Sequence, residues 1–311
     1  MINKIFNKNL LNHTDHLNFF IKLYLNKKLP QTFLIKGEKG IGKLNFAFHF
    51  VNFILSQHEE NKYEIKSYKI NSNNKTFKLL SENIHPNFFL ISLNENKKNI
   101  DILQIKKMQN FLNMSSFNNM PKIILINDCE YLNLSSSNAL LKSLEEKYDN
   151  VFFILILDIK KTLLSTIKSR CVQFKFLLKN NERIDKINEL LDNQYDLLSP
   201  DFKDKYLNLS FYKDLLDYCK KNKLELQNIN LYNLLANIFA SQNYKKNEFL
   251  INNLFSLIQL FLHKRIIDNI NINKNFSYLK YFTKRFDDIN KYNLDFESYV
   301  LEFKYLIYNE K

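Results

Sequence analysis

The segment Gly37-Glu38-Lys39-Gly40-Ile41-Gly42-Lys43 follows the apolar run Thr32–Ile35 and matches GxxxxGK, the pattern of a phosphate-binding loop between a strand and a helix. Glycines let such a loop approach phosphate closely, while the lysine and the N-terminus of the next helix add positive potential. The chain has three glycines, and all of them lie in this segment. The sequence therefore predicts a P-loop fold whose candidate phosphate ligands are Gly37, Gly40, Gly42 and Lys43.

Short apolar runs alternate with helix-like stretches through the first 176 residues. Buried parallel strands read this way, so the alternation favours an α/β domain with helices covering a parallel sheet. The expected strands are Thr32–Ile35, Phe88–Ser92, Lys122–Ile126, Val151–Leu157 and Val172–Phe176, and the expected helices cover residues 43–57, 100–113, 134–147 and 161–168. The polar segment 58–76 is expected to be an exposed connection.

Beyond residue 177 the strand-like runs stop and helical spacing takes over. It is clearest in Leu250, Leu254, Ile258 and Phe261, which fall on one helix face at intervals of about one turn. Such a face packs into the protein's own core or against a partner, and core packing is the general rule. The second part of the chain is therefore predicted to be all helical.

Composition limits the cellular setting. The longest uninterrupted apolar run, Val151–Leu157, is far shorter than the roughly 20 residues of a membrane-spanning helix. The N-terminus lacks the layout of a secretory signal. The three cysteines, Cys129, Cys171 and Cys219, are too far apart for a CxxC metal knuckle and do not form a disulfide framework. A cytoplasmic protein with no membrane contact and no metal site is expected.

The formal net charge of +13 permits nucleic-acid binding, since clustered Lys and Arg neutralise phosphates. The alternative is compositional: abundant Lys, Asn, Ile, Phe and Tyr beside scarce Gly, Pro and Arg is what an AT-rich genome encodes. The chain has 41 lysines against four arginines, so an arginine at a particular position carries more information than a lysine.

The predicted nucleotide site departs from a working ATPase at several positions. Leu44 stands where a Ser or Thr hydroxyl ligates Mg²⁺. After the strand Lys122–Ile126, Asn127 and Asp128 take the places of the acidic pair that holds Mg²⁺ and orients water. Asp128 and Glu130 are the alternative acidic pair. Two states fit these residues. The loop either binds ATP or ADP without hydrolysing it, or is empty and has a structural role. No intrinsic ATPase activity is expected.

Three linked motifs follow Asn127: NALLKSLEE from Asn138, the run VFFILIL from Val151, and TIKSRC ending at Cys171. Their order and spacing resemble the clamp-loader branch of the AAA+ family. The segment His85-Pro86-Asn87-Phe88 and the stretch IDILQIKKM from Ile100 are similar to further segments of that family. The resemblance covers about residues 10–176.

This resemblance implies a three-domain AAA+ fold: a P-loop α/β domain at 1–176, a small helical lid at 177–217 and a helical collar domain for oligomerisation at 218–311. Clamp loaders are five-subunit arcs that use ATP at subunit interfaces to open a sliding clamp and place it on primed DNA. The implied partners are the gamma/tau and delta subunits and, through the complex, the sliding clamp and DNA. The chain would be a component of a DNA polymerase holoenzyme.

In this family the arginine of SRC projects into the ATP site of the neighbouring ATPase subunit, and the matching residue is Arg170. A planar guanidinium can contact phosphate oxygens bidentately and stabilise charge that develops in phosphoryl transfer. The other interpretation is an ordinary salt-bridged surface arginine. The resemblance therefore implies that Arg170 acts in trans as an arginine finger.

Other departures from the family favour a non-hydrolysing stator subunit. A sensor threonine is missing near Leu157 and Asp158, and residues 51–85 contain no cysteine, so no zinc site is expected. Lys147-Tyr148 replaces two prolines, and His13 and His16 are expected to be packed or solvent-facing rather than metal ligands. Two alternatives stay open: an active gamma/tau-type ATPase, and a nucleic-acid-binding scaffold unrelated to clamp loading.

Overall fold

The computed structural model describes residues 7–10, 12–94, 97–203, 207–240, 244, 247–292 and 294–309. The chain forms two compact units, Met1–Arg183 and Ile184–Lys311. The boundary falls within helix α7 (Asn180–Leu190). The division into three domains with boundaries at residues 176 and 217 stays a prediction.

The first unit is built on five parallel strands, in the order β2-β3-β4-β1-β5. All five lie where the sequence predicts strands, with ends that differ by two residues at most. Their bounds are β1 (Thr32–Gly37), β2 (Phe88–Ile91), β3 (Lys122–Ile126), β4 (Val151–Asp158) and β5 (Val172–Lys175). The prediction of a parallel α/β domain followed by a helical region is confirmed.

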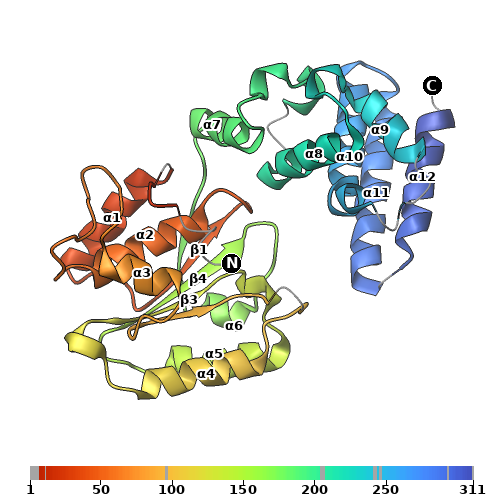
Figure 1. Cartoon of the computed structure of the whole chain (residues 1–311). Coiled ribbons are helices and arrows are strands. Elements are labelled where there is room, and N and C mark those ends of the chain that lie inside the picture. Colours follow the sequence, from red (N-terminus) through yellow and green to blue (C-terminus); the bar gives the residue numbers. More distant parts are fainter. Residues whose placement is uncertain are drawn as a thin grey trace. The chain divides into compact units, whose positions relative to one another are not determined.

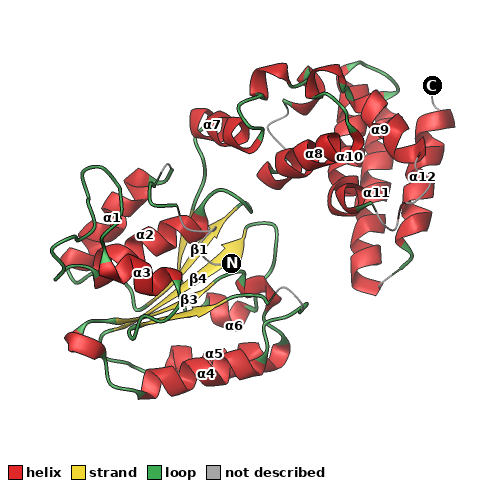
Figure 2. Ribbon diagram, in the orientation of Figure 1, coloured by secondary structure: helices red, strands yellow, loops and turns green. Residues whose placement is uncertain are grey.

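Helices cover both faces of this sheet (Figures 1 and 2). One layer holds α1 (Thr14–Leu25), α2 (Lys43–Leu55) and α3 (Lys75–Ser81), and the other holds α4 (Ile102–Asn113), α5 (Leu134–Glu145) and the short α6 (Ser165–Lys168). Side chains alternate along β1, because successive residues of a strand point to opposite faces. Phe33 joins an aromatic cluster with Phe20 and Phe50, whereas Leu34 packs into the core beneath α4 and α5.

Two parts of the first unit differ from expectation. Helices α1 and α3 fall in segments for which the sequence analysis expected no helix. The segment 58–76 is not simply an exposed connection, because Tyr63 and Ile70 are buried. The fully buried Asn74 accepts a hydrogen bond from the Phe77 backbone N–H and so caps α3. The sequence gives no signal for these buried residues, because the segment is mostly polar and single buried residues leave no periodic pattern.

The second unit is helical throughout its described part, as predicted. Its helices after α7 are α8 (Leu209–Asn222), α9 (Leu231–Ala240), α10 (Glu248–Ile267), α11 (Ile272–Tyr292) and α12 (Phe296–Asn309). The face of α10 that carries Leu250, Leu254, Ile258 and Phe261 is buried, which settles that this face belongs to the unit's own core. Across the described residues, no helix is both long and apolar enough to span a membrane.

Candidate functional site

The loop after β1 has the backbone shape that its glycines suggest. Gly40 and Gly42 have φ values of 88° and 94°, in the left-handed region that residues with a Cβ rarely adopt. Gly37 is needed for a different reason. A Cβ there would lie 2.5 Å from Ile41 Cδ1 and 2.7 Å from the Phe176 carbonyl oxygen. Gly42 ends the loop as the N-cap of α2, so the helix begins at Lys43.

Lys43 is buried and points back to its own loop. Its Nζ donates hydrogen bonds to the carbonyl oxygens of Gly37 at 2.8 Å and Glu38 at 2.6 Å. Burial lowers the pKa of Lys43, and the nearby carboxylates of Asp158, Glu130 and Asp128 oppose that shift. The ammonium group therefore already has two protein acceptors within the loop.

Acidic and amide side chains from β3 and β4 meet at the same carboxyl edge of the sheet. Asn127 Nδ2 donates to Asp128 Oδ2 at 2.8 Å, directly after β3. Asp158 ends β4 and pairs with Gly37 in the sheet register. Burial raises the pKa of Asp128, an effect that Lys39 and Lys43 counteract. The structure thus brings together Lys43, Asp128 and Asp158, although the sequence analysis did not select Asp158 as a site residue.

The alternative acidic pair, Asp128 and Glu130, has a different geometry from the one expected. If both residues continued the strand β3, they would point to the same face, but Asp128 has φ 53° and Glu130 lies in the 3₁₀ turn Cys129–Tyr131. Glu130 still faces Lys43 closely enough to affect its pKa. Burial also raises the pKa of Glu130, and its Oε2 is buried with no hydrogen-bond partner among the described residues.

These residues do not fit a catalytic Mg²⁺. Leu44 offers no oxygen at the position after the P-loop lysine, and Asn127 contributes a neutral amide that is already bonded to Asp128. Mg²⁺ requires near-ideal octahedral oxygen ligation, usually with carboxylates and phosphates. No hydrolytic step can therefore be derived from this chain's own loop.

Two residues that the sequence analysis did not place at the site hold the loop in position. The ring Nε2 of His13 lies 2.9 Å from the Ile41 carbonyl oxygen, to which it donates because a carbonyl can only accept. Arg183 pairs with Glu38 at 3.0 Å and both side chains are partly buried. His13 also packs against Phe176. The histidine is thus packed, as expected, and its contact with the loop had no signal in the sequence.

Arg170 lies near the amino end of the parallel strands, whereas the P-loop lies at their carboxyl end. It follows α6 and precedes β5, whose first residue, Val172, pairs with Phe33 near the start of β1. The P-loop begins at the other end of β1, at Gly37. Gly37 lies four positions further along the strand than Phe33, a distance of about 13 Å. Arg170 is therefore poorly placed to serve the phosphate loop of its own chain.

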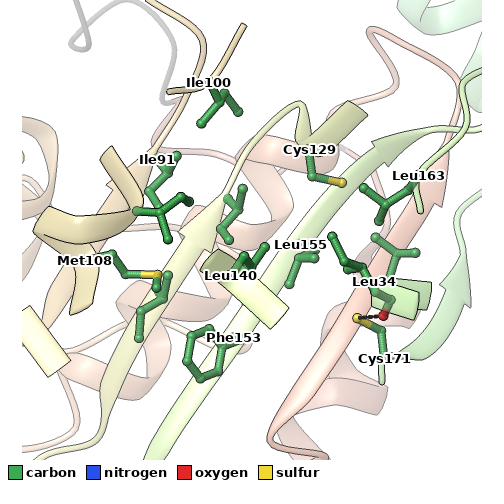
Figure 3. Packing of buried hydrophobic residues seen from close by; sticks show 14 of the residues in the cluster. Leu34, Ile91, Ile100, Met108, Cys129, Leu140, Phe153, Leu155, Leu163 and Cys171 are labelled. Atoms are coloured by element: carbon green, nitrogen blue, oxygen red, sulfur yellow. Dashed lines mark hydrogen bonds between the residues drawn. The ribbon is translucent and has the colours of Figure 1, made fainter. Parts of the chain in front are cut away.

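The backbone around Arg170 is anchored in the core. Cys171 belongs to the buried cluster beneath α5, together with Leu34 and Leu163, and its Sγ donates to the Ile167 carbonyl oxygen (Figure 3). In contrast, the Arg170 side chain is 43% exposed and pairs with Glu145 at 2.5 Å. A fixed backbone thus presents an exposed guanidinium. Sequence motifs predict this arginine but give no signal for its carboxylate partner.

The fold and the site define a P-loop α/β protein that lacks some of the usual metal ligands. Its exposed arginine lies at the end of the sheet opposite the P-loop. The chain belongs to the family of DNA polymerase III delta prime subunits of the clamp loader. A family model described as "DNA polymerase III, delta subunit" matches residues 12–180, more than half of the chain. The resemblance inferred from NALLKSLEE and TIKSRC is confirmed at the level of the family.

Two delta prime subunits and one solved structure are also similar to this chain. The delta prime subunit of Buchnera aphidicola subsp. Schizaphis graminum is 29% identical over 290 residues, covering 82% of this chain and 84% of that protein. The delta prime subunit of Pseudomonas aeruginosa is 33% identical over 141 residues, covering 45% of this chain and 41% of that protein. Among solved structures, a gamma subunit-related protein from Thermotoga maritima covers 94% of this chain and 99% of that chain at 19% identity, with a TM-score of 0.45.

Proposed function

We propose that this chain is the stator subunit of a cytoplasmic clamp loader and supplies Arg170 to the ATP site of a neighbouring subunit. It assembles with gamma/tau and delta subunits, and the complex places the sliding clamp on primed DNA. The proposal is supported mainly by the position of Arg170 near the amino end of the strands, away from its own P-loop at the carboxyl end. A phosphate that this guanidinium contacts would then belong to another molecule.

The direct test replaces Arg170 in the reconstituted complex. We expect Arg170→Ala to leave assembly intact and to lower kcat at the site it serves by on the order of 10³, the lower end for an arginine finger. Arg170→Lys should retain little of the original kcat, because lysine cannot contact phosphate bidentately. Lys168→Ala, which removes a positive charge from α6 nearby, is the matched control. DNA-dependent ATPase and clamp loading that are unchanged in Arg170→Ala would refute the proposal.

The chain's own loop is proposed not to hydrolyse nucleotide, so that any ATP or ADP held by Gly37, Gly40, Gly42 and Lys43 stays intact. The absent hydroxyl at Leu44 and the amide of Asn127 support this proposal. We expect the purified chain to release no phosphate from ATP in the presence of Mg²⁺. Clear Mg²⁺-dependent turnover would contradict the proposal and favour the gamma/tau-type alternative.

One observation favours nucleic-acid binding as a second candidate function. Counted along the sequence, the excess of Lys and Arg over Asp and Glu is +12 in residues 1–183 and +1 in residues 184–311. The charge is therefore concentrated in the P-loop unit. Salt-sensitive DNA binding by the isolated chain, without co-purification of clamp-loader subunits, would support this candidate over the stator.

A further inference from the structure

The two motifs on which the resemblance to the family was based meet in space through one ion pair. Arg170 of TIKSRC donates from Nη2 to Oε1 of Glu145, the last residue of helix α5 and part of NALLKSLEE. The partners are 25 positions apart in the sequence. The pair lies near the amino end of the strands, where Arg170 is exposed. It involves the same guanidinium to which the proposed function gives a role in trans.

The backbone of Arg170 is anchored in the core, whereas its side chain is partly exposed. Its N–H donates to the Ile167 carbonyl oxygen at 3.1 Å, and the Ile167 side chain is fully buried. The side chains of Arg170 and Glu145 are 43% and 50% exposed. Exposed ion pairs are weak and screened by salt, so a phosphate could displace the carboxylate without disturbing the core.

Glu145 is placed where a carboxylate needs a counter-ion. It ends α5, and the C-terminus of a helix carries partial negative charge that disfavours a nearby anion. Lys142 lies in the same last turn. The next carboxylate, Glu146, instead accepts a hydrogen bond from the Tyr148 hydroxyl. The two adjacent glutamates thus have different partners, which makes Glu146 a natural control for Glu145.

We propose that Glu145 is the resting counter-ion of Arg170, a positioning residue that competes with the neighbouring subunit's nucleotide phosphate for the guanidinium. This inference rests on the proposed function of Arg170. The carboxylate holds the guanidinium on its own chain until the nucleotide is in place. Transfer of Arg170 to the phosphate then replaces one anionic partner with another and leaves Glu145 to solvent.

The experiment compares Glu145→Gln with Glu146→Gln in the reconstituted complex. Since kcat/KM measures the step from free enzyme and substrate to the transition state, loss of a competing interaction in the free enzyme raises it. We expect kcat/KM for ATP in the DNA-dependent ATPase reaction to rise about twofold to fivefold at low salt, as a weak exposed pair allows. The increase should shrink at high salt, and Glu146→Gln should show none.

A double-mutant cycle separates this inference from the proposed function. In the Arg170→Ala background, Glu145→Gln should have no effect, because the partner is absent. An unchanged or lowered kcat/KM in Glu145→Gln, or the same increase in the Arg170→Ala background, would overturn the role of Glu145. An Arg170→Ala complex with full activity would instead overturn the proposed function itself.

Discussion

At the scale of single residues, the P-loop shows why glycine is confined to one segment of this chain. Gly42 has open space around it but a φ of 94°, whereas Gly37 has close neighbours on both sides. The sequence predicts that the three glycines are needed together. The structure shows that they are needed for two separate reasons, backbone conformation and close approach.

This difference gives a prediction for Gly37→Ala. The new methyl group would collide with the Phe176 carbonyl oxygen, which cannot move without shifting the backbone beyond β5. We expect a loss of about 1–3 kcal/mol in the free energy of unfolding, as for other overpacked sites. Urea denaturation measures it.

Gly42→Ala is the matched variant, because it meets the strain of positive φ without a steric clash. Its expected cost is about 1–2 kcal/mol. A Gly37→Ala protein as stable as the original chain would show that the close approach described for Gly37 is wrong.

The resemblance was sufficient to select Arg170 but not to explain its surroundings. Scarcity of arginine made the residue conspicuous in a lysine-rich sequence. The partner Glu145 was equally visible as a letter in NALLKSLEE, yet its pairing depends on where α5 ends relative to α6. Spacing along the chain carries no information about that distance.

At the scale of elements, the segment His85-Pro86-Asn87-Phe88 has a structural function. Asn87 is fully buried at the start of β2. Its Nδ2 donates to the Phe117 carbonyl oxygen at 2.8 Å, and its Oδ1 accepts from the Phe117 N–H at 2.7 Å. One side chain thereby fixes the short 3₁₀ turn Phe117–Asn119 beside β2. The sequence marked this segment only by its resemblance to the family.

Asn87→Ala should therefore destabilise the first unit. It leaves two backbone groups of Phe117 without their partner, and each unsatisfied group costs about 1–3 kcal/mol when water cannot replace the bond. We expect a loss of at least about 2 kcal/mol in the free energy of unfolding. Chemical denaturation is the measurement.

The control is Asn113→Ala, at the exposed last residue of α4, which should change the stability by less than about 0.5 kcal/mol. Equal losses of stability in the two variants would contradict the stabilising role of the hydrogen bonds between Asn87 and Phe117.

At the scale of the whole molecule, buried histidines couple the stability of the first unit to pH. His49 is fully buried between the Tyr63 hydroxyl and the Asn7 carbonyl oxygen, each at 2.8 Å. Burial lowers the pKa of His49 and of His13 from 6.5 to about 4. Between these values the unfolded chain binds more protons than the folded one, so stability is complete above pH 6.5 and is lost as the pH falls toward 4.

We therefore expect the free energy of unfolding to fall with decreasing pH below 6.5, with His49 contributing up to about 1.4 kcal/mol per pH unit. Replacing His49 with Gln should reduce that slope. Comparing variant and original chain between pH 5 and 6.5 cancels the effects of other titrating groups. An equal slope in His49→Gln would contradict the assignment.

The amino-acid sequence was enough to predict the parallel α/β class, the positions of all five strands, the helical second part and the family. These properties can be predicted from local patterns. The periodicity of apolar residues, the placement of glycines and the linked motifs are each visible within one segment of the chain. It also selected the loop residues from Gly37 to Lys43 and Arg170.

Which of these residues share a site depends on how the elements pack in three dimensions. The tertiary structure places Asp158 beside Gly37, at the carboxyl end of β1, and Arg170 near the amino end of the same strands. It brings His13 to Ile41 across 28 positions, and Arg183 to Glu38 across 145. These contacts could not be predicted, because packing between elements that are distant in the sequence leaves no period in it.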